Sequence, residues 1–177
     1  MTAMTVTIDA AATRLTATDF RQLMSCWSTG VAVVTTATGD EPLGCTVNAI
    51  TSVSLEPPLL LVSLAARSRT LAAIAERGLL GVNLLPAQRS DLARRFASGE
   101  PAARFAGVDY DWTMGVPVLR DVVTAAVCVT ERRMPVADHV LVVAEPVWWY
   151  RDLHRRPLVC FDRSYWTLWT MARVARV

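Results

Sequence analysis

Residues 29–64 constrain the fold more than any other part of this chain. Their sequence, TGVAVVTTATGDEPLGCTVNAITSVSLEPPLLLVSL, alternates runs rich in Val, Thr, Ile and Leu with short groups of Gly, Asp and Pro. β-Branched residues favour strands, and Gly, Asp and Pro favour turns. The stretch therefore predicts three or four strands joined by tight turns, with strands over residues 31–36, 44–54 and 59–64.

A helical pattern precedes these strands. Thr18 is a candidate N-cap for this helix, and Gly30 is expected to end it. Between them, apolar residues recur with the i, i+3, i+4, i+7 spacing of one helical face. These residues are Phe20, Leu23, Met24 and Trp27.

Two shorter helices are predicted further along the chain. The first covers residues 69–76, with Ser68 as its candidate cap and Gly78 at its end, and the second covers residues 90–97. Leu71 and Ile74 are expected to point inward from the first helix, and Leu92 and Phe96 share one face of the second.

The rest of the chain is dominated by strands. They are predicted at residues 79–85, 122–132, 139–149 and 158–161, whereas residues 99–115 are rich in loop formers. This order is neither a βαβ alternation nor an all-helical pattern. It predicts a mainly β fold with peripheral helices, in which antiparallel strands form a closed or partly closed barrel.

The composition sets limits on domain number and on function. A chain of 177 residues is expected to form one domain, over residues 18–170, with a flexible lead-in at 1–17 and a tail at 171–177. A net charge of +2 does not favour binding to nucleic acid or membranes. A cytoplasmic location is expected, and the 53% hydrophobic content favours burial of further surface in an oligomer.

Several classes of site are excluded by missing residues. All 18 basic residues are arginine, so a P-loop lysine, a Schiff base and a lysine general base are excluded. The chain contains neither a GxGxxG nor a GxSxG motif. Four widely spaced cysteines without a CxxC pair, and two histidines, predict free thiols and no metal site; these are Cys26, Cys45, Cys128, Cys160, His139 and His154.

The segment at residues 44–54 is unusually polar for a strand. Its hydroxyl and amide side chains could bind the polar edge of a flat ligand, or could simply form a solvent-exposed strand face. Both interpretations are open from the residues alone. The side chains concerned are Thr46, Asn48, Thr51, Ser52 and Ser54.

A candidate anion site follows at the start of the predicted helix at 69–76. Arg67 and Arg69 alternate with the hydroxyls of Ser68 and Thr70 at this helix N-terminus. Cationic side chains, hydroxyls and helix N-terminal amides all favour an anion. Ordinary capping with solvated arginines is the alternative interpretation.

Two further positions are candidates for function. Asn83 lies within an apolar strand, where a buried amide needs partners; a structural role is the commoner case. Asp138 precedes His139 at the start of a strand, where a carboxylate can orient an imidazole and raise its basicity. A solvent-exposed histidine at a strand end is the alternative.

These motifs and their order, over about residues 20–165, resemble the flavin reductase family. Its members are small flavin-binding split β-barrels that supply reduced flavin to a separate monooxygenase. The resemblance implies an NAD(P)H-dependent flavin reductase that uses FMN or FAD with NADH or NADPH. A homodimer is expected, because it would bury the high apolar content and the tryptophan-rich C-terminal third. A flavin- or heme-binding carrier or sensor, and a split-barrel oxidase acting on a small metabolite, are the alternatives.

The resemblance also implies roles for individual residues. His139 is expected to face the nicotinamide. The chain differs from the usual family pattern at Ala49 and Ala137, and lacks a glycine between two aromatics near Tyr165. The implied flavin-binding residues are Thr29, Gly30, Thr46, Val47, Asn48, Ala49, Ser52, Ser63, Leu64, Ser68, Arg69, Thr70, Asn83 and Tyr165.

Overall fold

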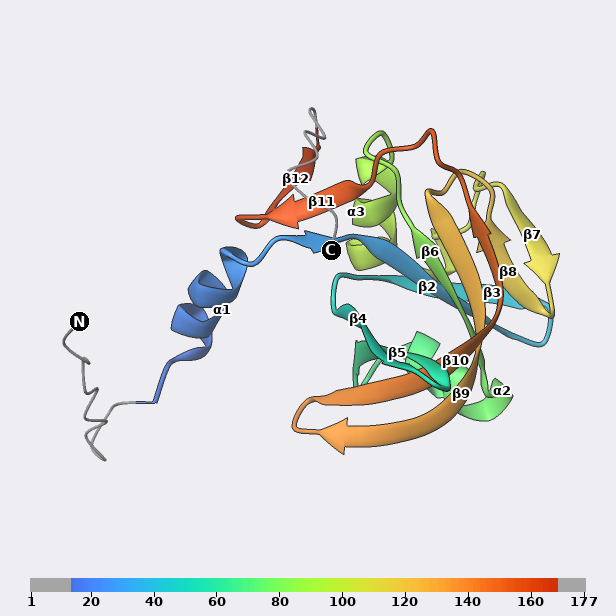
Figure 1. The fold of residues 1–177 in the computed structure, drawn as a ribbon, viewed down its shortest axis with the longest axis horizontal. Coiled ribbons are helices and arrows are strands. Elements are labelled where there is room, and N and C mark those ends of the chain that lie inside the picture. The colour runs from blue at the N-terminus through green and yellow to red at the C-terminus, as the bar shows by residue number, and fades with distance from the viewer. Residues whose placement is uncertain (1–13, 169–177) are drawn as a thin grey trace.

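A single seven-stranded antiparallel sheet forms most of the molecule (Figure 1). The computed structural model describes residues 14–168. The strand order in this sheet is β3-β2-β6-β9-β10-β5-β4. The strands are β2 (Ala32–Thr38), β3 (Glu41–Val47), β4 (Ile50–Leu55), β5 (Pro58–Ala65), β6 (Leu79–Leu84), β9 (Thr124–Val136) and β10 (His139–Arg151).

The sheet closes because consecutive strands β3 and β4 form its opposite edges. The predicted single strand over residues 44–54 is therefore wrong. After Val47 the chain stops pairing with β2, passes through the exposed residues Asn48 and Ala49, and begins to pair with β5. The Ala49 carbonyl accepts a hydrogen bond of 3.0 Å from the Ser63 amide of β5. Two residues thus bring both edges together, which gives the split barrel that the resemblance implied.

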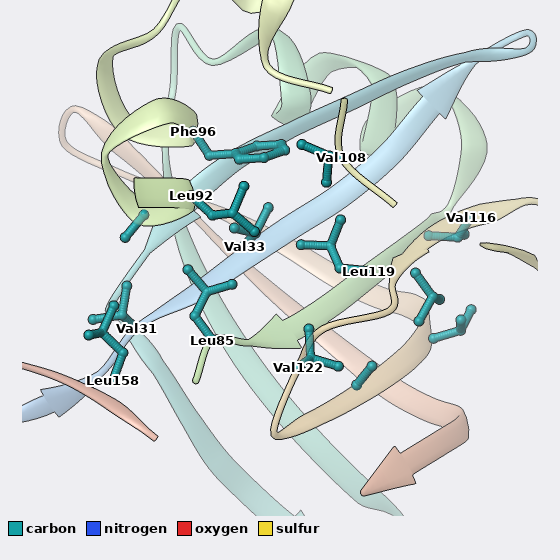
Figure 2. Close-up of a cluster of buried hydrophobic side chains, with 14 residues drawn as sticks. Val31, Val33, Leu85, Leu92, Phe96, Val108, Val116, Leu119, Val122 and Leu158 are labelled. Atoms are coloured by element: carbon teal, nitrogen blue, oxygen red, sulfur yellow. The ribbon is translucent and has the colours of Figure 1, made fainter. Parts of the chain in front are cut away.

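Strand β2 is the centre of the hydrophobic core. Successive side chains of a strand point to opposite faces, and both faces of β2 are covered. Val33 packs in a cluster with residues from α3 and β8, as Figure 2 shows. Val34 packs in a second cluster with residues from α2, β5 and β10. This double burial explains why residues 31–37 are all buried.

Helix α2 (Arg69–Arg77) confirms the prediction for this segment to within one residue. The Ser68 hydroxyl caps it by accepting a hydrogen bond from the Leu71 amide, and Gly78 ends it in the left-handed region with φ of 69°. Leu71 and Ile74 are both buried, as expected.

Helix α3 (Ser90–Ser98) also matches its prediction, and Leu92 and Phe96 are buried beneath it. The helix lies directly on β3. A Cβ atom on Gly44 of β3 would lie 3.0 Å from the Val34 carbonyl oxygen and 3.1 Å from the Phe96 ring. Glycine at this position therefore allows the close approach of helix and strand.

Helix α1 (Ala17–Ser25) begins and ends earlier than predicted. Its N-cap is Thr16 rather than Thr18, because Asp19 lies three residues after Thr16 and completes a capping box with it. The helix stands apart from the barrel in Figure 1 and buries none of its residues. Within residues 14–168, no helix is long and apolar enough to cross a membrane.

Two small antiparallel sheets complete the fold. β7 (Tyr110–Thr113) pairs with β8 (Val116–Leu119), and β1 (Thr29–Gly30) pairs with β11 (Leu158–Phe161), which pairs with β12 (Ser164–Thr167). The prediction missed β7, β8, β12 and a short 3₁₀ helix at Pro101–Ala103. Each hairpin turn has two residues with positive φ, Met114 and Gly115 in the first and Asp162 and Arg163 in the second. Only the first contains a glycine, and neither has the usual Asn-Gly or Asp-Gly pair.

Candidate active site

A pocket of about 270 Å³ opens where the chain passes from β3 to β4. It brings together residues that are distant in sequence, from the β3–β4 connection, from β5 and from β10. Asn48 and Ala49 are exposed, and their backbone lies outside the strand ladder. Most of the predicted site residues line this pocket, namely Thr46, Val47, Asn48, Ala49, Ser63, Leu64, Ser68 and His139.

Thr46 has a structural bond as well as a place in this pocket. Its hydroxyl donates a 2.7 Å hydrogen bond to the Ala93 carbonyl of α3. This bond fixes α3 against the pocket wall. The hydroxyl oxygen keeps lone pairs that can accept from a ligand.

A second pocket, of about 380 Å³, adjoins the first at Cys45 and Ser68, which line both. It lies at the N-terminus of α2, where backbone amides are unpaired. Arg67, Arg69 and Arg104 line it, and no carboxylate does. Three cations beside a helix N-terminus favour the binding of an anion. Thr70 also lines this pocket, although its side chain is buried.

Arg104 was not identified from the sequence. Its guanidinium donates hydrogen bonds to the carbonyls of Gly44, at 2.8 Å, and Gly99, at 3.1 Å. These bonds hold the charge over the pocket. Arg104 is far from Arg69 in sequence, and only the packing of α3 on β3 brings it there, so no local spacing could have indicated it.

Cys45 is an uncharged residue that lines both pockets at their junction. Burial raises the pKa of its thiol, and the hydrogen bonds of Thr70 and Ser68 oppose that shift. The thiol is therefore neutral at physiological pH. An uncharged side chain therefore lies where the arginine-lined anion pocket meets the polar pocket.

His139 lies at one end of the first pocket, as the first residue of β10. Its Nδ1 atom is 2.8 Å from Asp138 Oδ1, and this hydrogen bond is the main cause of a lowered pKa for the Asp138 carboxyl. Ala137, the residue before Asp138, has φ of 51°. This left-handed turn, an unusual conformation for alanine, directs the Asp138–His139 pair to the end of the β9–β10 hairpin.

Asn83 lies elsewhere, and the structure argues against its predicted contact with flavin. Its side chain is fully buried between β2, β6 and β8. The amide nitrogen donates to the Val33 carbonyl and to the Thr35 hydroxyl, and the amide oxygen accepts from the Leu119 backbone at 2.9 Å. The polar groups of Asn83 are thus satisfied within the fold, and the structural interpretation is the one supported.

Four other predicted flavin-binding residues do not line either pocket. Ser52 is exposed on β4. Thr29, Gly30 and Tyr165 belong to the small β1-β11-β12 sheet, where Thr29 pairs with Cys160 and Tyr165 pairs with the same cysteine. The resemblance placed these residues at one site with Thr46 and Asn48, and this part of the assignment stays a prediction.

Side chains that bind metals do not form a cluster in the part of the chain that the structure describes. No group of three or more His, Cys, Asp or Glu side chains within residues 14–168 could hold a metal ion. The four cysteines are free thiols. The polar pocket and its anion pocket are therefore the features from which a function is inferred.

Known flavin reductases are similar to this chain in sequence. An NADH-dependent FMN reductase, AsuE2, from Streptomyces nodosus subsp. asukaensis is 42% identical over 160 residues, which cover 85% of this chain and 84% of that protein. The reductase subunit HsaB of a flavin-dependent monooxygenase from Mycobacterium tuberculosis is 33% identical over 149 residues, covering 82% of this chain and 79% of HsaB.

A solved structure agrees with these relatives. The NADH:FAD oxidoreductase SgcE6 of Streptomyces globisporus, in complex with NAD and FAD fragments, superposes with a TM-score of 0.81 at 27% identity. The superposition covers 90% of this chain and 94% of SgcE6. The family model for the flavin reductase like domain matches residues 24–168. The chain belongs to the flavin reductase like domain family.

Proposed function

We propose that this protein is an NAD(P)H:flavin oxidoreductase that supplies reduced FMN or FAD to a separate monooxygenase. The observation that carries the proposal is the adjacency of a polar pocket and an arginine-lined anion pocket, with His139 at the end of the first. This arrangement suits a flat polar ring joined to a phosphate. Relatives named as flavin reductases and as a reductase subunit of a monooxygenase support it.

In this proposal each part of the site has a binding or positioning role. Asn48 and the exposed connection at Ala49 hold the polar edge of the flavin ring. Arg67, Arg69 and Arg104 hold its phosphate. When bound, the flavin supplies the hydride acceptor.

His139 positions the nicotinamide against the flavin ring, and Asp138 fixes the orientation of the imidazole through the 2.8 Å hydrogen bond. Hydride transfer requires no side chain to act as an acid or base. The contribution of the chain is therefore to align the two reactants and to exclude water between them.

We also propose a homodimer. Apolar side chains on α1 that form one helical face are exposed, among them Phe20 at 55% and Leu23 at 59%. A second copy of the chain would cover this face. A cytoplasmic location, where thiols remain reduced, is part of the same proposal and agrees with the four free cysteines.

Flavin titration tests the proposal directly. FMN and FAD fluorescence should be quenched on binding, with a Kd of tens of micromolar or tighter, roughly −6 kcal/mol. Anaerobic mixing of the flavin-loaded protein with NADH or NADPH should then bleach the flavin absorbance within the dead time or soon after. Absence of binding by either flavin would overturn the proposal, and binding without reduction would favour a carrier.

A further inference from the structure

A third pocket, of about 590 Å³, lies between α3 and the β11–β12 hairpin and has no role in the proposed function. The hairpin supplies one aromatic ring, that of Tyr165, and α3 supplies a cation, Arg94. The residues used in the argument below are Ser90 and Arg94 of α3 and Arg163, Ser164 and Tyr165 of the hairpin.

One stripe of α3 connects this third pocket with the anion pocket. Ser90, Arg94 and Ala97 follow the i, i+4, i+7 spacing, so they share a helical face. The Arg94 guanidinium donates a 3.1 Å hydrogen bond to the Ser90 hydroxyl, which confirms that these two side chains are neighbours. Ala97 lines the anion pocket. From Ser90 to Ala97 the helix rises about 10 Å.

The third pocket is positively charged and aromatic. The Arg94 guanidinium carbon lies 5.8 Å from the centre of the Tyr165 ring. Within residues 14–168 neither Arg94 nor Arg163 forms an ion pair, and no Asp or Glu lines the pocket. Aromatic rings stack on nucleobases, and arginines beside hydroxyls bind phosphate. This combination suits a nucleoside phosphate better than an apolar ligand.

We propose that the third pocket binds the adenosine monophosphate half of a dinucleotide. The dinucleotide backbone runs along α3 from the anion pocket to Arg94, and the adenine lies against the Tyr165 ring. FAD and NAD(P)H both contain this half. FAD is the better fit, because its flavin end occupies the polar pocket that adjoins the anion pocket. The inference rests on the proposed function.

Two variants test the pocket without disturbing the barrel. Arg94→Gln removes an exposed cation. Arg163→Gly removes the other cation at a position with φ of 55°, a conformation that glycine adopts readily. The matched control is Arg133→Gln, because Arg133 is an exposed arginine on β9 that lines neither the anion pocket nor the third pocket.

Each variant is titrated with FAD and with FMN, and its KM is measured for NADH and for reduced nicotinamide mononucleotide. If FAD occupies the pocket, Arg94→Gln weakens FAD binding about tenfold, which corresponds to about 1.4 kcal/mol, and leaves FMN binding unchanged. If NADH occupies it, the KM for NADH rises while that for the mononucleotide does not. Either result supports an adenylate site and identifies its source.

The inference and the proposed function fail in different ways. Equal losses for FAD and FMN, or no loss for any ligand with either variant, would overturn the adenylate site while leaving flavin reduction intact. Absence of binding by FMN and FAD to the unaltered protein would instead overturn the proposed function and the inference together. Melting curves confirm that each variant is folded at the assay temperature.

Discussion

Helices α1 and α2 have nine residues each and begin at hydroxyl side-chain caps, yet they differ in what covers their apolar faces. In α2, Leu71 and Ile74 are 7% and 0% exposed, because the barrel covers them. In α1, Leu23 is 59% exposed. An amphipathic pattern therefore predicts that a helical face will be covered, and does not say whether the cover comes from the same chain.

Replacement of Ile74 by Ala should have the largest effect, on the α2 side of this comparison. Truncation of a fully buried aliphatic side chain costs about 2–5 kcal/mol of unfolding free energy. Urea denaturation measures the loss. Leu23→Ala is the matched substitution on α1; under conditions where the protein is monomeric, an equal loss from it would show that the two faces are not different.

Leu23→Asp should dissociate the proposed homodimer and leave each protomer folded. A charge placed at the centre of an apolar interface is expected to cost at least about 2 kcal/mol of association free energy, as interface hot spots do. Light scattering at micromolar concentration should give twice the chain mass for the unaltered protein and a single chain mass for the variant. Gln22→Glu adds a charge on the opposite face of α1 and should leave the dimer intact.

Arg69→Ala tests the other asymmetry between the helices, since only the N-terminus of α2 lines an anion pocket. Loss of a charge-assisted hydrogen bond should weaken FMN binding by about 1.5–3 kcal/mol. Riboflavin, which has no phosphate, should bind the variant as well as it binds the unaltered protein. Arg21→Ala on α1 is the control, and equal losses for FMN and riboflavin would mean that Arg69 does not contact the phosphate.

His139→Ala should have the smallest effect, because His139 is exposed and lines the polar pocket without lining the anion pocket. Removal of one imidazole contact in an open pocket is expected to cost about 1 kcal/mol, seen as a several-fold higher KM for NAD(P)H with unchanged flavin affinity. Asp138→Asn keeps the imidazole but weakens its orientation, so it should raise the KM less. Loss of flavin binding with an unchanged KM would refute the nicotinamide assignment.

Local signals predicted some elements closely, and the tertiary fold determined the rest. Ser68 and Gly78 mark the two ends of α2 by their own capping chemistry, so its limits could be predicted to within one residue. The break between β3 and β4 could not, because one Asn followed by Ala, within residues that favour strands, is a weak turn signal without Gly or Pro. The break arises from the pairing of β3 with β2 and of β4 with β5.

The candidate site also combines residues that the sequence could predict with residues that only the tertiary fold brings together. The hydroxyls and arginines at residues 67–70 are contiguous in sequence, and they line the anion pocket as a group. Arg104 reaches the same pocket only because α3 packs on β3. Asn83 was assigned to the flavin because sequence position cannot tell a buried amide that bonds within the sheet from one that faces a ligand.

The closure of the barrel at Asn48 and Ala49 has a consequence for stability. The two edge strands of the sheet, β3 and β4, do not pair with each other. The two-residue connection and the side chains beside it hold these edges together. A ligand bound between β3 and β4 would contact both edges of the sheet and stabilise the closed barrel. By mass action, a flavin at 100 times its Kd would add about 2.7 kcal/mol to the free energy of unfolding. The protein would therefore unfold more readily when flavin is scarce.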